Sequence, residues 1–243
     1  MNYFIYNGIS SKNMGVRISS KNIFSAPKYD LAFQSIPGRD GDLISPNGRF
    51  PNVMVSYTCF IPAKSIAELS AKVTAVKGWL YTEPDRYHTL SDSYDTGFTR
   101  KAVFNNKLDI SDELNRIGVF TVNFTCHPMR FSVDGAKKST HTAKSFQLTN
   151  PYQFYSKPYI KITGSGTGTL TIQSASLNKT WNFKSISEYI ECDSELMNFY
   201  KATVLKNDTV TGDAFPLLGP GKNTFTFSGG ITKIEVIPRW CSL

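Results

Sequence analysis

The chain has 243 residues, of which 40% are hydrophobic and 19% are charged, so it can bury a core and does not resemble disordered, collagenous or coiled-coil proteins. Its formal net charge of +8 suggests some affinity for polyanions, but the basic residues form no tail or cluster. With 12 tyrosines, 17 phenylalanines and 17 glycines, the composition favours short strands joined by turns over long helices.

No continuous apolar stretch approaches the roughly 20 residues that a membrane-spanning helix needs, so no membrane partner is expected. Residues 1–8 have neither a basic region nor a long apolar region, which argues against a secretory signal peptide and for synthesis in the cytoplasm. The cysteines are scattered, without CxxC spacing. We therefore expect buried thiols in a reducing compartment, rather than disulfides or a zinc site, at Cys59, Cys126, Cys192 and Cys241.

Strand patterns dominate the first half of the chain. Residues 3–6 and 14–18 surround a polar turn and predict a hairpin. Residues 53–61 and 117–126 alternate between apolar and polar side chains. Because successive side chains of a strand point to opposite faces, this alternation predicts two long strands that each bury one face.

A projecting arm is predicted between these strands. Residues 31–36 read as a strand, and two turn clusters follow closely, at 37–42 and at 46–49. Two turn clusters so near each other predict an extended loop or a β-hairpin that projects from its domain.

One helix is clearly indicated. Ser65 and Glu68 have the spacing of a capping box, and the helix is expected to end near Tyr81. Apolar residues recur after Ser65 at intervals of three and four, which places one stripe of the helix against a core. That stripe consists of Ile66, Leu69, Val73, Val76 and Leu80.

A change of composition marks the domain boundary. Residues 132–156 are rich in Lys, Ser, Thr and Asn and are expected to connect two domains. Short strand patterns separated by Gly, Asn and Asp turns then fill residues 157–243, which is typical of a β-sandwich. We therefore predict a mainly β protein with two domains, a β-sandwich with one α-helix and a β-hairpin arm in residues 1–131 and a second β-sandwich in residues 157–243.

The sequence gives little support for catalysis. Its three histidines lie outside any catalytic motif, and Cys126 and His127, as neighbours on one strand, point to opposite faces. The glycine-rich segment 164–168 lacks the GxGxxG spacing of a nucleotide-binding loop, so we expect it to connect two strands. We predict no catalytic residue, no metal site and no cofactor, and therefore no enzyme.

Two weaker signals lie in the second domain. Glu191, Asp193 and Glu195 alternate, so on one strand face they could hold calcium or act as the carboxylates of a glycoside hydrolase. An ordinary exposed acidic face is the simpler interpretation. Trp181 and Tyr189 could form a sugar-stacking platform, although a large aromatic residue in a small sandwich more often packs in the core.

Several short motifs occur in a fixed order along both halves of the chain. The first half carries MGV at 14–16, IPGRDG at 36–41, GRF at 48–50, GWL at 78–80 and FTVNFTCHP at 120–128. The second half carries KPYIKITG at 157–164, IECDSE at 190–195, FPLLGPGKN at 215–223 and PRW at 238–240. Taken together, these motifs resemble the distal tail proteins of siphophages that infect Gram-positive hosts.

This resemblance implies a structural role at the tip of the virion tail. In that family the first domain forms a hexameric ring, single or stacked in pairs, and the second domain is a galectin-like sandwich. The ring is the hub that joins the tail tube protein to the tail-associated tip protein and receptor-binding proteins. It also gives DNA a channel for release, without sequence-specific binding.

By carry-over from the family, the arm would contact a neighbouring subunit. Its candidate contact residues are Pro37, Gly38, Arg39, Asp40, Gly41, Asp42, Arg49 and Phe50. The alternative function is a carbohydrate-binding adhesin that recognises host cell-wall sugars through Trp181 and Tyr189 of the second sandwich. A glycoside hydrolase that uses Glu191 or Asp193 is the third hypothesis.

Overall fold

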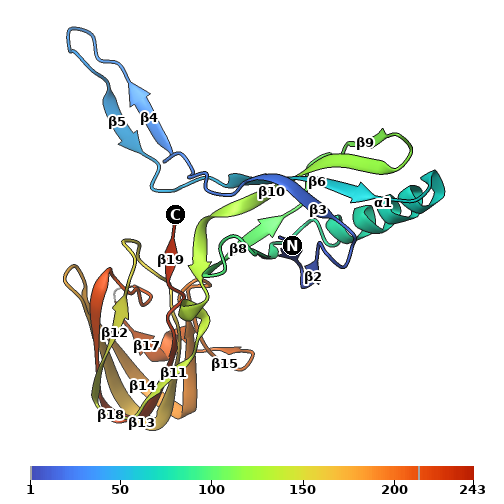
Figure 1. Ribbon diagram of the computed structural model, residues 1–243. Coiled ribbons are helices and arrows are strands. Elements are labelled where there is room, and N and C mark those ends of the chain that lie inside the picture. Colours follow the sequence, from blue (N-terminus) through green and yellow to red (C-terminus); the bar gives the residue numbers. More distant parts are fainter. Residues whose placement is uncertain (1, 213) are drawn as a thin grey trace. The chain divides into compact units, whose positions relative to one another are not determined.

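The computed structural model describes residues 2–212 and 214–243, which divide into two compact units. The first unit runs to Arg130 and includes Leu243, and the second runs from Phe131 to Ser242. Each unit is built around an antiparallel sheet, and the described residues contain one α-helix (Figure 1). The structure thus confirms the predicted mainly β fold with one helix and a hairpin.

The sheet of the first unit has the strand order β2-β1-β7-β8-β10-β6-β3, and β9 also pairs with β10. The long strands β6 and β10 pair over ten residues, from Ile117 opposite Pro62 to Cys126 opposite Val53. The strands are β1 (Phe4–Tyr6), β2 (Ile9–Ser10), β3 (Arg17–Asn22), β6 (Val53–Pro62), β7 (His88–Asp92), β8 (Phe98–Val103), β9 (Ile110–Glu113) and β10 (Ile117–Ser132). The last strand of the chain, β19 (Cys241–Ser242), belongs to the second unit.

Helix α1 (Ile66–Leu80) begins and ends close to its predicted limits. The Ser65 hydroxyl accepts a hydrogen bond from the backbone N–H of Glu68, which confirms the predicted cap. Its buried residues are Leu69, Val76, Trp79 and Leu80. Ile66, the first residue of the predicted apolar stripe, was expected to be buried but is 54% exposed.

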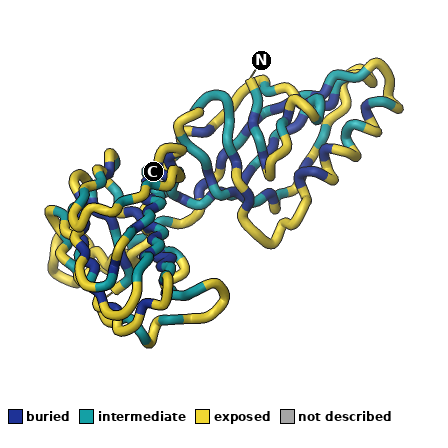
Figure 2. The backbone as a smooth tube through the Cα atoms, turned by 90° about the horizontal axis from the view of Figure 1, so that it is seen from below, coloured by how far each residue is buried: buried dark blue, intermediate teal, exposed yellow. Residues whose placement is uncertain are grey.

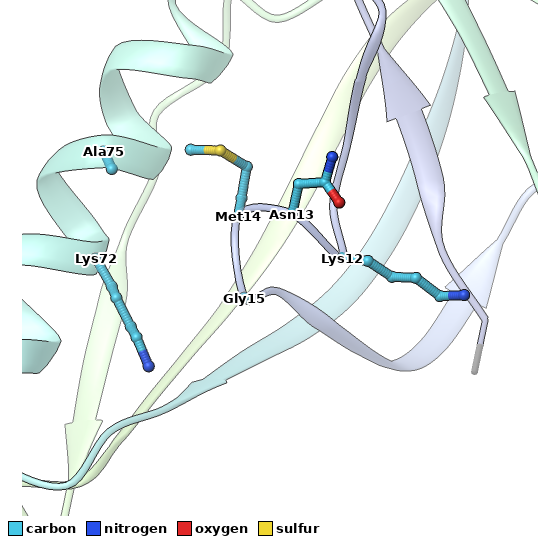
Figure 3. Close-up of a pocket in the computed structure, with 6 residues that line it drawn as sticks. All are labelled: Lys12, Asn13, Met14, Gly15, Lys72 and Ala75. Carbon is cyan, nitrogen blue, oxygen red and sulfur yellow. The ribbon is translucent and has the colours of Figure 1, made fainter.

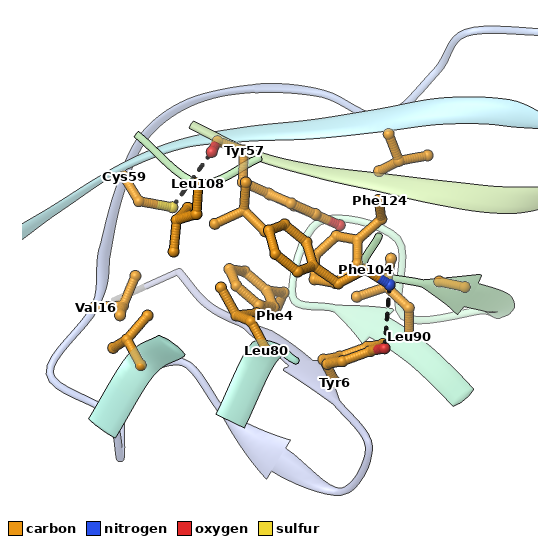
Figure 4. Close-up of a cluster of buried hydrophobic side chains, with 14 of the residues drawn as sticks. Phe4, Tyr6, Val16, Tyr57, Cys59, Leu80, Leu90, Phe104, Leu108 and Phe124 are labelled. Carbon is orange, nitrogen blue, oxygen red and sulfur yellow. Dashed lines mark hydrogen bonds between the residues drawn. The ribbon is translucent and has the colours of Figure 1, made fainter. Parts of the chain in front are cut away.

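Aromatic side chains fill the core of the first unit (Figure 4). Phe4 stacks on Tyr57 with ring centroids 4.7 Å apart and on Trp79 of α1 at 5.5 Å. The indole N–H of Trp79 donates a hydrogen bond to the carbonyl oxygen of Tyr6, so this buried polar group is satisfied. The aromatic core therefore fixes α1 against the strands.

The second unit holds an eight-stranded sheet in the order β11-β18-β13-β14-β15-β16, in which β12 pairs with β18 and β17 pairs with β14. Buried and exposed residues alternate along its strands as they do in the first unit (Figure 2). The elements are η1 (Asp134–Ala136), β11 (Ser139–His141), β12 (Ser145–Asn150), β13 (Tyr159–Gln173), β14 (Asn178–Asp193), β15 (Asn198–Lys201), β16 (Val204–Leu205), η2 (Asn207–Thr209), β17 (Val210–Thr211) and β18 (Gly221–Ile237).

Residues 132–156, which the sequence predicts to be a connector, contain η1, β11 and β12. Both strands pair with β18, and β12 does so over six residues, from Ser145 opposite Thr226 to Asn150 opposite Gly221. Most of this polar segment is therefore part of the second sheet, because the hydrogen bonds of the sheet satisfy its backbone whatever its side chains are.

The glycine-rich segment 164–168 is not a connecting loop but an irregular middle part of β13. Here the register of β13 shifts against both β14 and β18. A Cβ atom on Gly230 of β18 would lie 1.6 Å from the carbonyl oxygen of Ser165, and one on Gly164 would lie 2.3 Å from that of Gly230. The glycines thus allow two backbones to approach at a bulge.

Candidate functional site

The hairpin arm consists of β4 (Leu31–Gln34) and β5 (Leu43–Pro46), which form a two-stranded sheet of their own (Figure 1). Phe33 lies opposite Ile44, and Leu31 lies opposite Pro46. Because residues two apart on a strand share a face, these four side chains form one apolar face of the arm. Phe33 and Ile44 are each 56% exposed, which is unusual for a paired apolar set.

The opposite face of the arm is more polar. It carries Ala32 opposite Ser45 and Gln34 opposite Leu43. Among the described residues, neither β4 nor β5 pairs with a third strand, so each has an edge with backbone groups available for pairing. The arm therefore offers both an apolar face and an open sheet edge.

The base of the arm is closed by polar contacts. The Asp30 carboxylate accepts hydrogen bonds from the amide of Asn47 and the guanidinium of Arg49, at 2.9 and 2.8 Å, and these two bonds lower the pKa of Asp30. Their backbones are also joined, since Asp30 N–H donates to Arg49 and Asn47 N–H donates to Asp30. The rings of Tyr29 and Phe50 meet edge to face at 4.8 Å.

The predicted contact residues thus fall into two groups. Arg49 and Phe50 lie at the base of the arm, where their contacts are within the chain. The other six, Pro37, Gly38, Arg39, Asp40, Gly41 and Asp42, form the exposed turn at its tip. Gly38 and Gly41 have φ values of +80° and +78°, which only glycine adopts readily.

Sequence reasoning missed the apolar face as a candidate contact surface. It placed the site in residues 37–50 and left out β4, so Phe33 was not a candidate, and Ile44 was not singled out. The alternation of Leu31 and Phe33 could have indicated an apolar face on β4. Only the register between β4 and β5 shows that Ile44 and Pro46 lie on that same face.

The three acidic residues singled out in the sequence, Glu191, Asp193 and Glu195, lie among structural contacts. Asp193 is 7% exposed and forms a bidentate ion pair with Arg239, with both N···O distances 2.8 Å. It also accepts backbone hydrogen bonds from Glu195 and Leu196, which turn the chain away from the strand direction. Glu191 accepts a hydrogen bond from the Tyr159 hydroxyl. The geometry is that of a folded turn rather than of two carboxylates facing a substrate.

Burial opposes ionisation of Asp193, but the Arg239 guanidinium outweighs it and holds the pKa of Asp193 below its ordinary value. We expect Asp193→Asn to lower the free energy of unfolding at pH 7 by on the order of 2–3 kcal/mol, because Arg239 loses its charged partner. The wild-type contribution is present above the ordinary pKa of about 3.9 and is lost as the pH falls through the lower folded value. Urea unfolding at pH 7 and pH 3 measures this.

The matched control is Asp134→Asn, which breaks the exposed pair between Asp134 and Lys137 and is expected to change stability by less than about 0.5 kcal/mol. The two variants should differ less in free energy of unfolding at pH 3 than at pH 7. An equal difference at both pH values would contradict the role of the Asp193 ion pair.

The two aromatic residues predicted to stack on sugar are both engaged in the fold. Trp181 is 2% exposed and its indole N–H donates to the carbonyl oxygen of Ala214, so its ring lies in the core. The ring of Tyr189 lies near two ammonium groups, that of Lys161 at 3.8 Å from its centroid and that of Lys201 at 5.2 Å. The Trp181 ring is therefore closed to a sugar, whereas Tyr189 is half-buried beside the two lysines.

Within residues 2–212 and 214–243, no group of three or more His, Cys, Asp or Glu residues is placed to hold a metal ion. None of the described helical segments is both long and apolar enough to cross a membrane. The described cysteines are all buried as free thiols.

The whole chain has the fold of a known phage protein. Over 100% of both chains it superposes on the SPP1 Dit protein, described as a paradigm of the hub adsorption apparatus in phages infecting Gram-positive hosts, with a TM-score of 0.78 and 12% identity. It also matches chains of the phage p2 baseplate in its activated conformation, with strontium and with calcium, over 97% of this chain and 98% of theirs. Their TM-scores are 0.51 and 0.50, at 7% identity. No family model and no curated protein matches the sequence.

Proposed function

We propose that this chain is the structural hub of a phage tail tip, a ring of six copies that joins the tail tube protein to the tail-associated tip protein and receptor-binding proteins. The observation that carries the proposal is the match to the SPP1 Dit fold along the entire length of both chains, with both units and the arm included. The role is mechanical, so it requires no catalytic site and no cofactor.

The arm supports this proposal independently. Its apolar face, with Phe33 and Ile44 exposed, is a surface that a partner would cover. A ring needs one surface of each copy to meet a different surface of the next, and a hairpin that belongs to neither main sheet suits such a contact. We therefore assign the arm to the contact between neighbouring copies.

Such a ring would be basic as a whole, and we expect a mild rather than a dense basic lining of its channel. Six copies would carry a formal charge of about +48, six times the +8 of one chain. A dense basic lining would hold DNA through salt-dependent contacts, so we expect the charge to be spread over the outer and inner surfaces of the ring. DNA would pass through without sequence-specific contacts.

The test of the hub is the absolute mass of the purified protein, measured by light scattering after size exclusion at several salt and protein concentrations. We expect about 163 kDa, six times the chain mass of 27.1 kDa, or twice that value for stacked rings. Negative-stain electron microscopy would then show six-fold rings. A monomer at every concentration that also fails to assemble with tail tube and tail-tip proteins would contradict the proposal.

A further inference from the structure

A hollow of about 310 Å³ lies beside α1 in the first unit (Figure 3). A second hollow of about 220 Å³ shares Lys12, Gly15 and Lys72 with it. In Figure 3 the turn before β3 passes close to the helix, with Met14 extending towards Ala75. The residues that line the two hollows are Lys12, Asn13, Met14, Gly15, Val16, Arg17, Pro62, Lys72 and Ala75.

The hollows are basic with an apolar wall. Lys72 donates a hydrogen bond to the carbonyl oxygen of Pro62 and forms an ion pair with Glu68 at 2.7 Å, so its ammonium group is fixed in place. Lys12 lies over the ring of Tyr3, and Arg17 is exposed at the start of β3. The hollows are thus lined by three basic residues and no acidic one, although the Lys12 side chain points away from α1 in Figure 3 and Lys72 is already paired with Glu68. Such a space suits a short acidic turn.

The chain itself carries a segment of this kind, the tip of the arm. Asp40 and Asp42 are exposed on either side of Gly41, whose missing side chain lets the turn enter a narrow space. Arg39 lies beside them and has the opposite charge to Glu68. The tip, with two carboxylates and one guanidinium, and the lining of the hollows, with three basic residues, are thus opposite in net formal charge.

We propose that the hollows beside α1 receive the tip of the arm from a second copy of this chain. This inference rests on the proposed function and specifies the acceptor surface of its ring contact. The tip and the hollows are different surfaces, so the contact is heterologous and can close into a ring. Ten residues separate Asp30 at the base from Asp40, and at about 3.3 Å per strand residue the arm spans roughly 30 Å, enough to reach a neighbour.

Cysteine cross-linking of the full chain tests the proposed contact. A variant that carries both Asp42→Cys and Lys12→Cys is treated with a short bismaleimide and separated on a denaturing gel. Burial raises the pKa of Cys59, Cys126 and Cys192 to about 12 and that of Cys241 to about 11, so the native thiols stay unreactive. We expect a ladder of covalent oligomers up to six chains.

The matched control replaces Lys12→Cys by Lys77→Cys, which alters an exposed lysine of the same helix-bearing unit that does not line the hollows. We expect at least about tenfold more ladder from the first variant than from the control, because a seated tip has a high effective concentration at Lys12. The variants with one new cysteine should stop at dimers.

Equal ladders in the two double variants would overturn the inference. If light scattering shows six-membered rings but the ladder does not exceed the control, the hub stands and the assigned acceptor surface is wrong. If neither rings nor ladder form, the proposed function fails as well.

Discussion

Replacing Gly230 with alanine is expected to lower the free energy of unfolding of the second unit by more than about 4 kcal/mol, an exceptional loss for one methyl group. The added Cβ would lie 1.6 Å from the carbonyl oxygen of Ser165 and 3.1 Å from that of Thr167. Both are backbone atoms of β13, so neither can rotate away as a side chain would. The strands would have to separate where β13 and β18 pair, and the buried faces of both would be opened. Urea unfolding followed by near-ultraviolet circular dichroism measures the loss.

Gly78→Ala is the control for this prediction. Gly78 lies in α1, and a Cβ there would meet no atom within 4 Å. Alanine is favoured over glycine in a helix, so we expect this variant to gain about 0.5–1 kcal/mol. If Gly230→Ala unfolds at the same urea concentration as the wild type, the close approach of the two strands is wrong.

Placing aspartate at both Phe33 and Ile44 is expected to abolish assembly while leaving the monomer folded. Both side chains are more than half exposed in the isolated chain, so their loss should change its stability by less than about 1 kcal/mol. Burying each in a contact would contribute roughly 1.5–3 kcal/mol, and burying a pair of unpaired charges instead would oppose the contact. We expect the concentration needed for half-assembly to rise by more than about 100-fold. Light scattering and thermal unfolding measure the two effects.

The opposite face of the same hairpin provides the matched control. Ala32→Asp with Ser45→Asp also puts two aspartates directly opposite each other, because these residues are a register pair. Any damage to the hairpin itself is therefore common to both variants. We expect the control to assemble with less than about a fivefold change, because its substitutions lie on the more polar face. Equal losses in the two variants would show that the apolar face is not the contact.

Much of the fold is local in origin and could be predicted from the sequence. The cap of α1 joins Ser65 to Glu68, and the alternation within β6 and β10 needs no information beyond the strand itself. The arm was predicted from two turn clusters a few residues apart, and the resemblance to distal tail proteins predicted the fold that the SPP1 Dit structure shares. These features can be predicted because each depends on residues that lie close together in the sequence.

Other features of the structure depend on pairings between distant residues. Strand β12 joins the sheet by pairing with β18, some eighty residues later, so its polar sequence gave no sign of a strand. Gly164 of β13 must be small because the backbone of Gly230 lies against it, and Asp193 forms its ion pair with the distant Arg239. The sequence by itself thus determined α1, the long strands β6 and β10, the arm and the charge of its tip. Only the tertiary structure decided that Trp181 is buried and that a hollow lined by basic residues lies beside α1, because both depend on packing between segments that are remote in the chain. The shared apolar face of the arm is a local feature, but it depends on the register of the hairpin, which turn clusters alone do not give.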